Sequence, residues 1–199
     1  MKVLNLYAGI GGNRALWTDC EVTAVELNPK FAEEYQELFP NDKVIVADAH
    51  NYLRLNHDNF DFIWSSPPCQ SHSRANYFAQ HIRKEQIFPN MDLYEEIIFL
   101  QHFSKCRWVV ENVIPYYNEL IPATKIGRHL FWSNFVIPVI PQPKGEIGTM
   151  MKEYVGTAKH AHDKKLTERN AVNNELGLHI FNIARGIYNH YNSNQGQLF

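Results

Sequence analysis

The fold of this chain can be worked out from one segment, Val3-Leu4-Asn5-Leu6-Tyr7-Ala8-Gly9-Ile10-Gly11-Gly12. Residues 3–7 form an apolar run typical of a buried strand, and the glycines predict a tight turn into a short helix over 15–17. Glycine lets the backbone approach a ligand closely, and the start of a helix offers unpaired N–H groups to an anion. On these residues alone, the turn either binds a ligand or simply connects a strand to a helix.

Beyond this segment, short apolar runs alternate with amphipathic stretches. Helices are predicted after Asn28-Pro29 and over 92–103, and residues 69–90 look polar and loop-like. Further strands are predicted over 22–26, 44–46, 60–64 and 108–110, and two extended pieces over 128–140. A C-terminal helix is expected within 169–191. Such alternation predicts a parallel sheet covered by helices on both faces.

Five residues with chemical potential fall at or just past the ends of predicted strands. In open α/β sheets, ligands bind at the carboxyl ends of the strands. We therefore expect one crevice to hold all five, which are Tyr7, Glu26, Asp48, Cys69 and Glu111.

Two of these five suggest catalysis. Two prolines stiffen the backbone directly before the cysteine in Ser66-Pro67-Pro68-Cys69-Gln70, which suits a nucleophile held in a fixed direction. A buried, inert thiol is the alternative. Glu111 follows an apolar strand, where a low dielectric raises the pKa of a carboxyl and suits a general acid. An ordinary carboxylate at a strand end is the alternative.

The composition narrows the class of protein. The chain has 199 residues, of which 45% are hydrophobic and 20% charged, as in a globular domain. Its net charge of −2 does not by itself indicate a polyanionic partner. The three cysteines lack metal-ligand spacing, which predicts a reducing compartment and no metal site. No apolar run approaches the ~20 residues of a membrane span, so we expect no membrane partner and a cytoplasmic location.

Three motifs together resemble the cytosine-5 DNA methyltransferase family. They are Tyr7-Ala8-Gly9-Ile10-Gly11-Gly12, then Pro68-Cys69-Gln70-Ser71-His72-Ser73, and finally Glu111-Asn112-Val113. Their order and spacing agree with the family over most of residues 1–135. The likeness resumes at Arg169-Asn170-Ala171-Val172, where arginine replaces the usual glycine. The resemblance implies a Rossmann-like class I methyltransferase fold with a mostly parallel sheet, helices on both faces and a small loop-rich insert.

The resemblance also implies a cofactor, S-adenosyl-L-methionine, with S-adenosyl-L-homocysteine as its product and no metal. By position, Tyr7 would pack on the adenine and the turn 9–12 would surround the methionine part. Glu26 would hold the ribose hydroxyls and Asp48 the adenine amino group. The implied cofactor-binding residues are Tyr7, Ala8, Gly9, Gly11, Gly12, Glu26, Leu27, Asp48, Ala49, Pro68, Asn170 and Val172.

For the chemistry, the resemblance implies that Cys69 attacks carbon 6 of a flipped-out cytosine while Glu111 acts at N3. The family's Arg-x-Arg pair is reduced to Arg128, which would contact the cytosine or orient Cys69, with Lys125 or His129 as a stand-in for the second arginine. A surface arginine is the alternative for Arg128. The implied substrate-binding residues are Gln70, Ser71, Ser73, Arg74, Asn76, Asn112 and Lys125.

We expect residues 1–134 and 169–192 to form the catalytic domain, 135–168 a reduced target-recognition insert, and 193–199 a flexible tail. Residues 123–170 carry eight lysines and arginines against four acidic residues, a local excess of +4 that suits a phosphate-facing surface. A solvated charged loop would have the same composition.

The resulting hypothesis is a DNA cytosine-5 methyltransferase acting on duplex DNA, of the kind found in restriction-modification, in a bacterial or phage-infected cell. RNA or a free nucleotide is an alternative substrate because the recognition segment is short. A non-catalytic regulatory protein is a second alternative. A catalytic chain that depends on a separate recognition subunit is a third.

Overall fold

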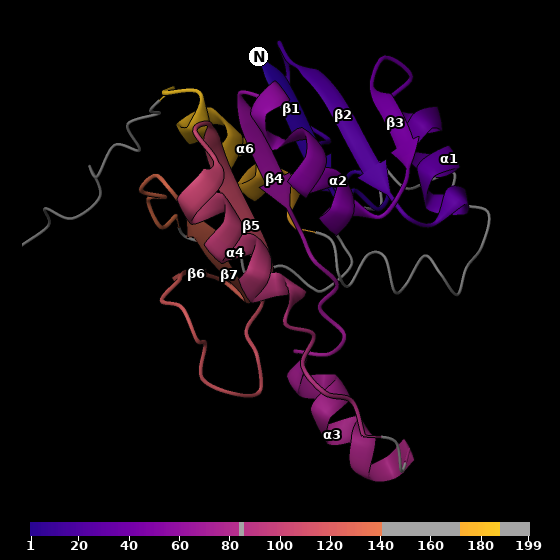
Figure 1. Cartoon of the computed structure of the whole chain (residues 1–199), viewed down its shortest axis with the longest axis vertical. Helices are drawn as coiled ribbons and strands as arrows, with labels where there is room; N and C mark the ends of the chain where they lie inside the picture. The colour runs from indigo at the N-terminus through magenta and orange to yellow at the C-terminus, as the bar shows by residue number, and fades with distance from the viewer. Residues whose placement is uncertain (84–85, 141–171, 188–199) are drawn as a thin grey trace, which may run out of the picture.

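The computed structural model describes residues 1–83, 86–140 and 172–187, and they build on a seven-stranded sheet of order β3-β2-β1-β4-β5-β7-β6 (Figure 1). Pairing is parallel from β3 through β5, whereas β7 runs antiparallel to both β5 and β6. The strands are β1 (Lys2–Leu6), β2 (Glu21–Glu26), β3 (Lys43–Val46), β4 (Phe62–Ser65), β5 (Arg107–Val113), β6 (Thr124–Ile126) and β7 (His129–Ser133).

Helices cover both faces of the sheet, as the alternation predicts. They are α1 (Pro29–Leu38), α2 (Ala49–Asn56), η1 (His57–Asn59), α3 (Arg74–Arg83), α4 (Asp92–Phe103) and α6 (Asn174–Ala184). One apolar cluster joins α2 and α4 to one face through Leu53 and Ile97, packed on β1 and β4. On the other face, α6 packs through Ile180 and Phe181, while α1 packs on Ala24 of β2. The mostly parallel, doubly covered sheet is therefore confirmed.

Two helix starts show how the sequence places the ends of β2 and β3. The side chain of Asn28 accepts a hydrogen bond from the Lys30 amide, and Pro29 occupies the first helical turn of α1. The side chain of Asp48 accepts from the Asn51 amide at 2.8 Å and so begins α2. α1 and α2 therefore begin shortly after β2 and β3 end, and Glu26 and Asp48 lie at the same edge of the sheet.

The prediction of a short helix over 15–17 is wrong. The segment makes successive three-residue turns instead, in which the amides of Gly11, Arg14 and Trp17 donate to carbonyls three residues earlier, at 2.9–3.0 Å. Two glycines disfavour a helix here, and β2 begins at residue 21 after a left-handed Asp19 (φ +56°).

Other boundaries differ in ways that polarity alone does not indicate. Residues 69–90 are not all loop, because α3 forms within them and projects away from the body of the molecule (Figure 1). The second extended piece of 128–140 is absent, since residues 134–140 form no strand. β6 and α2 were not predicted, and α6 is shorter than the helix expected within 169–191.

Within the described residues, none of the helices combines the length and the apolar character needed to cross a bilayer.

Candidate active site

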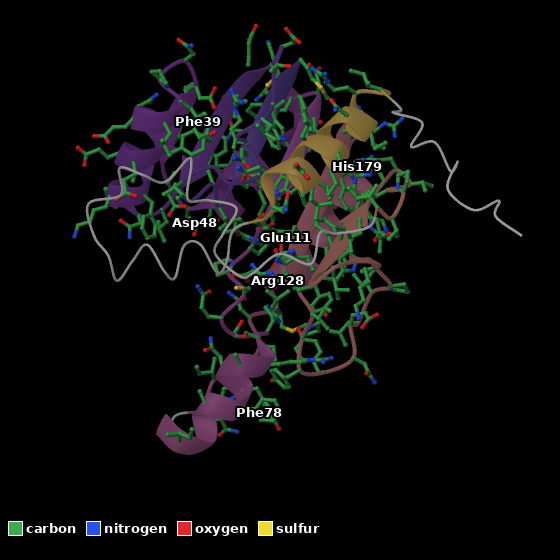
Figure 2. The ribbon with its side chains drawn as sticks, turned by 180° about the vertical axis from the view of Figure 1, so that it is seen from behind. Phe39, Asp48, Phe78, Glu111, Arg128 and His179 are labelled. Atoms are coloured by element: carbon green, nitrogen blue, oxygen red, sulfur yellow. The ribbon has the colours of Figure 1, made fainter. Side chains whose placement is uncertain are left out.

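A cavity of about 700 Å³ lies at the carboxyl ends of the parallel strands. Figure 2 shows Asp48, Glu111 and Arg128 at this same end of the sheet, on the side where α3 projects. The cavity brings together all five residues expected at the crevice. The sequence-predicted site residues that line it are Tyr7, Ala8, Gly9, Gly12, Glu26, Leu27, Asp48, Ala49, Pro68, Cys69, Gln70, Glu111 and Val172.

Glu26 ties the glycine turn to the loop that follows β2. One oxygen of its carboxylate accepts a hydrogen bond from the Gly9 amide at 2.9 Å, and the other accepts from the Asn28 amide at 2.8 Å. Gly9 adopts a left-handed backbone (φ +53°) with open space where a side chain would begin. Gly9 and Glu26 both line the cavity.

Gly11 serves packing rather than the cavity. A Cβ there would lie 2.4 Å from the Phe39 ring and 2.9 Å from the Tyr35 ring, and the residue has φ +82°. Gly11 therefore lets α1 pack against the turn and does not line the cavity with its glycine neighbours.

Tyr7 stands at the corner where β1 turns into the glycine segment. Its φ of +54° is unusual for a residue with a side chain and costs of order 1 kcal/mol. The Tyr7 hydroxyl donates to the carboxylate of Glu96 at 2.5 Å, and burial together with that charge raises the pKa of the hydroxyl. The ring consequently has one fixed orientation at the wall of the cavity.

Cys69 is held by backbone contacts on both sides. Its carbonyl accepts hydrogen bonds from the amides of His72 and Ser73. The side-chain amide of Asn112 donates to the Pro67 carbonyl at 2.9 Å, which connects the end of β5 to the Pro67-Pro68 segment. Asn112 is buried and does not line the cavity, and its expected substrate contact stays a prediction.

The electrostatics couple Cys69 to Glu111. Burial raises the pKa of Glu111 to about 7, against the opposing effects of a hydrogen bond with Ser66 and the charge of Arg128. Burial and the Glu111 charge raise the pKa of the Cys69 thiol to about 11, while Arg128 opposes this. At neutral pH the thiol is protonated, and Glu111 is poised to hold or release a proton.

Arg128 and His129 both face this pair. The charge of Arg128, at the turn between β6 and β7, acts on both Cys69 and Glu111. His129 Nε2 lies 3.7 Å from a carboxylate oxygen of Glu111. Burial and Arg128 lower the pKa of His129 to about 4, so this contact is between a neutral imidazole and the carboxyl at neutral pH. Lys125, the other suggested stand-in, is exposed on β6 and does not line the cavity.

The remaining residues expected to contact substrate make contacts within the Cys69 loop or with Pro115, which follows β5. The Ser71 hydroxyl accepts from the Asn90 amide, Arg74 donates to the Pro115 carbonyl, and Asn76 donates to the Gln70 carbonyl. Ser73 forms an isolated bridge with Pro115. These contacts anchor the base of α3, and only Gln70 of this set lines the cavity. Asn170 lies outside the described residues.

Sequence reasoning missed several lining residues. They are Ile10, Asn13, Asn28, Phe31, His50, Ser66, Pro67, His72, Asn90, Asp92, Leu93 and Val113. Asn28 and His50 directly follow predicted strand ends, so their position was a usable signal. Asn90 and Asp92 reach the cavity only because the chain returns from α3, which no local pattern reveals.

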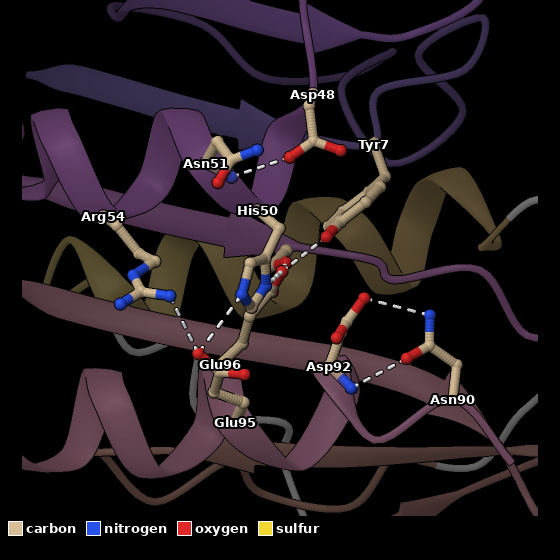
Figure 3. Close-up of polar contacts among 10 residues, drawn as sticks. Tyr7, Asp48, His50, Asn51, Arg54, Asn90, Asp92, Glu95 and Glu96 are labelled. Atoms are coloured by element: carbon tan, nitrogen blue, oxygen red, sulfur yellow. Dashed lines mark hydrogen bonds and ion pairs between the residues drawn. The ribbon is translucent and has the colours of Figure 1, made fainter.

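His50, Asp92 and Glu95 bring potential metal-ligand atoms within 4.8 Å of one another. Their groups are already engaged, because Asn90 donates to Asp92 and Arg54 donates to Glu95 (Figure 3). The expected absence of a metal remains a prediction.

Comparison with known proteins identifies the family. The model of the C-5 cytosine-specific DNA methylase family matches residues 1–113, which contain the glycine turn, the Pro68-Cys69-Gln70 segment and Glu111-Asn112-Val113. The chain belongs to this family. Its seven-stranded sheet has the Rossmann-like class I methyltransferase fold, as the resemblance implied. Membership also implies that S-adenosylmethionine is the methyl donor.

Two curated relatives differ in the nucleic acid that they are named for. One is a type II methyltransferase, M1.HphI, from Haemophilus parahaemolyticus, 27% identical over 125 residues that make up 57% of this chain and 32% of the relative. The other is the human tRNA (cytosine(38)-C(5))-methyltransferase, 33% identical over 81 residues, or 37% of this chain and 21% of the relative. The chain thus spans no more than a third of the length of either.

Among solved structures, a DNMT2 mutant from Spodoptera frugiperda is 25% identical, with a TM-score of 0.39 over 56% of this chain and 35% of that one. A putative methyltransferase from Escherichia coli, yhhF, is 16% identical, with a TM-score of 0.44 over 66% of this chain and 73% of that one.

Proposed function

We propose that this protein transfers a methyl group from S-adenosylmethionine to carbon 5 of cytosine in duplex DNA, with Cys69 as covalent nucleophile. The observation that carries the proposal is the shared cavity. Cys69 and Glu111 line the same space as the glycine turn and Glu26, so a base and a methyl donor would meet there.

The residues present fit the cofactor. A volume of about 700 Å³ is within the usual range of roughly 300–1,000 Å³ for ligand sites. Gly9 leaves open space beside the carboxylate of Glu26, where ribose hydroxyls could donate hydrogen bonds. Tyr7 and Phe31 offer aromatic rings, and Asp48 offers a carboxylate near Tyr7. When bound, S-adenosylmethionine would supply an electrophilic methyl group.

The chemistry of cytosine assigns the remaining roles. Carbon 5 is a poor nucleophile until a bond forms at carbon 6. The Cys69 thiolate forms that bond, and the displaced electron pair moves toward N3, where protonated Glu111 donates a hydrogen bond or its proton. Carbon 5 then accepts the methyl group. Loss of the carbon-5 proton and cleavage of the sulfur–carbon bond restore the ring and release Cys69.

The proton on Glu111 also helps to form the nucleophile. An ionised Glu111 raises the pKa of Cys69, whereas a protonated Glu111 exerts no such charge. Arg128 acts in the favourable direction, because its positive charge lowers the pKa of the thiol. We therefore place Arg128 beside the thiolate as a stabilising charge. A duplex substrate must present its cytosine flipped out of the helix, at a cost of a few kcal/mol.

RNA is a second candidate substrate. One relative is named for tRNA, and it is 33% identical over 81 residues of this chain. The proposed recognition segment, 135–168, is described only as far as residue 140.

A transfer assay tests the proposal. Purified protein is incubated with S-adenosylmethionine labelled in its methyl group and with duplex DNA, RNA or dCMP. Label in 5-methylcytosine of duplex DNA alone is the expected result, and label in RNA alone would overturn the DNA assignment. Activity that appears only after addition of a second chain would indicate a separate recognition subunit. A Cys69→Ala protein with an unchanged cellular effect would indicate a regulatory role.

A further inference from the structure

A buried carboxylate stands directly behind the cavity wall. Glu96 of α4 is fully buried and does not line the cavity. A buried carboxylate requires several donors to offset its desolvation. Glu96 has three of them: the Tyr7 hydroxyl at 2.5 Å, the Ser65 hydroxyl at 2.6 Å and His50 Nδ1 at 3.1 Å.

The three donors come from three different parts of the site. Tyr7 follows β1, Ser65 ends β4 just before the segment that carries Cys69, and His50 lies in the first turn of α2. Tyr7 and His50 both line the cavity, on the side where Asp48 and Ala49 also lie. Figure 3 shows His50 and Tyr7 directed toward the same carboxylate on α4.

We propose that Glu96 is a positioning residue that fixes the Tyr7 ring and the His50 imidazole as one wall of the cofactor site. This inference rests on the proposed use of S-adenosylmethionine and adds a residue that does not itself contact the cofactor. The left-handed backbone at Tyr7 is unfavourable for a residue with a side chain, and the contact with Glu96 helps to hold it. Without the hydroxyl contact, nothing on the ring's polar edge would oppose relaxation of that unfavourable turn.

The charge on His50 completes the arrangement. The groups that face it are Glu96, Glu95 and Asp92 from α4, Tyr7 from β1, and Arg54 on its own helix through Glu95. The hydrogen bond with Glu96 is the largest cause that raises the pKa of His50, to about 9. At neutral pH the imidazolium therefore offsets the buried negative charge of Glu96. Above pH 9 that compensation is lost and the wall should loosen.

The test compares wild type with Glu96→Gln and Tyr7→Phe by calorimetric titration with S-adenosylhomocysteine between pH 6 and pH 10. Tyr7→Phe removes one strong hydrogen bond to a charged group, and Glu96→Gln removes the charge that all three donors contact, so we expect affinity at pH 7 to fall about tenfold or more. Glu37→Gln, an exposed carboxyl on α1 outside the cavity lining, is the matched control and should bind within about twofold of wild type.

The pH profile separates positioning from simple loss of stability. NMR titration of the ligand-free protein should show the pKa of His50 falling toward its ordinary value in Glu96→Gln. The pH at which binding weakens should fall together with this pKa. The amine of S-adenosylhomocysteine also titrates, but it does so equally with both proteins and does not produce a difference between them. Tyr7→Phe, which keeps the charge pair, should lose affinity without this shift, and it serves if Glu96→Gln does not fold.

The outcomes distinguish the two levels of the proposal. If wild type does not bind S-adenosylhomocysteine, the cofactor assignment fails and this inference fails with it. If wild type binds but Glu96→Gln and Tyr7→Phe bind equally well, with an unchanged pH profile, the positioning role alone is overturned.

Discussion

The coupling between Cys69 and Glu111 is the most consequential feature at the scale of single residues. The thiol has a pKa of about 11, raised by burial and by the charge of Glu111. In Glu111→Gln the side chain carries no charge, so the pKa of Cys69 should fall below its wild-type value. Alkylation by iodoacetamide as a function of pH measures this, with Cys69→Ala as the control for the other two cysteines. An unchanged or higher pKa in the variant would contradict the coupling.

Glu111 also predicts how stability depends on pH. Its pKa of about 7 in the folded protein exceeds the ordinary 4.5, so the folded state holds a proton that the unfolded state releases between these values. Stability should therefore fall as pH rises from 4.5 to 7, by up to roughly 3 kcal/mol from this group. Glu111→Gln lacks this loss. Urea unfolding at pH 5 and pH 8 should show that the free energy of unfolding falls less between the two pH values in the variant than in wild type. Equal changes in both proteins would contradict the raised pKa of Glu111.

Several residue roles could be predicted from the sequence because they depend on local order. Cys69 and Glu111 each follow an apolar strand, and the carboxyl ends of parallel strands meet at one edge. Glu96 could not be predicted in this way. It does not follow a strand. Helical spacing places it on the same face as Leu93, Ile97 and Leu100, but the pattern does not show the donors that the packing of α4 on the sheet gives it.

At the scale of elements, the glycine turn and α1 make a matched pair of substitutions possible. Gly9 and Gly11 both have positive φ, but only Gly11 lacks room for a side chain. Gly9→Ala should destabilise the fold by about 1 kcal/mol through backbone strain. Gly11→Ala should lose about 1–3 kcal/mol more, because the rings of Tyr35 and Phe39 must move. Thermal or urea unfolding of the two variants decides this, and equal losses would refute the packing role of Gly11.

The docking of α6 on the same turn gives a second prediction. A Cβ at Gly177 would lie 2.4 Å from the backbone oxygen of Asn13, and the Gly177 carbonyl accepts from the Trp17 indole at 3.1 Å. Gly177→Ala should push α6 from the turn and destabilise the protein by about 1–3 kcal/mol, despite the better helix propensity of alanine. Glu175→Ala, exposed on the same helix, should change stability by less than about 0.5 kcal/mol. A stabilised Gly177→Ala protein would contradict the close approach.

Helices and strands could be predicted where apolar residues recur at regular spacing. They could not be predicted where contacts with distant segments determine the local structure. The helix over 92–103 matches α4 because its apolar residues recur at helical spacing. α3 was not predicted because its segment is rich in polar residues, although Phe78 and Ile82 stand at helical spacing; both side chains are exposed. The expected helix at 15–17 did not form, because the segment after the glycines makes successive three-residue turns. β6 forms mainly because β7 supplies a partner.

At the scale of the whole molecule, charge distribution bears on the substrate. The chain is −2 overall, yet residues 123–170 carry an excess of +4. If this region contacts DNA phosphates, methyl transfer at limiting duplex DNA should fall by about tenfold or more between 50 and 200 mM salt. Transfer to dCMP, if detectable, should change by less than about twofold. If methyl transfer to duplex DNA did not depend on salt, residues 123–170 would not be the surface that contacts the DNA phosphates.

The most direct test of the central claim uses duplex DNA in which the target cytosine is replaced by 5-fluorocytosine. The fluorine at carbon 5 takes the place of the proton that is normally lost and cannot be removed in the same way. The reaction therefore stops after methyl transfer, with Cys69 still bonded to carbon 6. We expect a denaturation-resistant protein–DNA adduct that requires S-adenosylmethionine and disappears in Cys69→Ala. A protein that binds S-adenosylhomocysteine yet forms no adduct with any duplex, while 5-fluorocytosine RNA traps it, would contradict DNA as the substrate. If the Cys69→Ala protein also formed the adduct, the assignment of Cys69 as the nucleophile would be wrong.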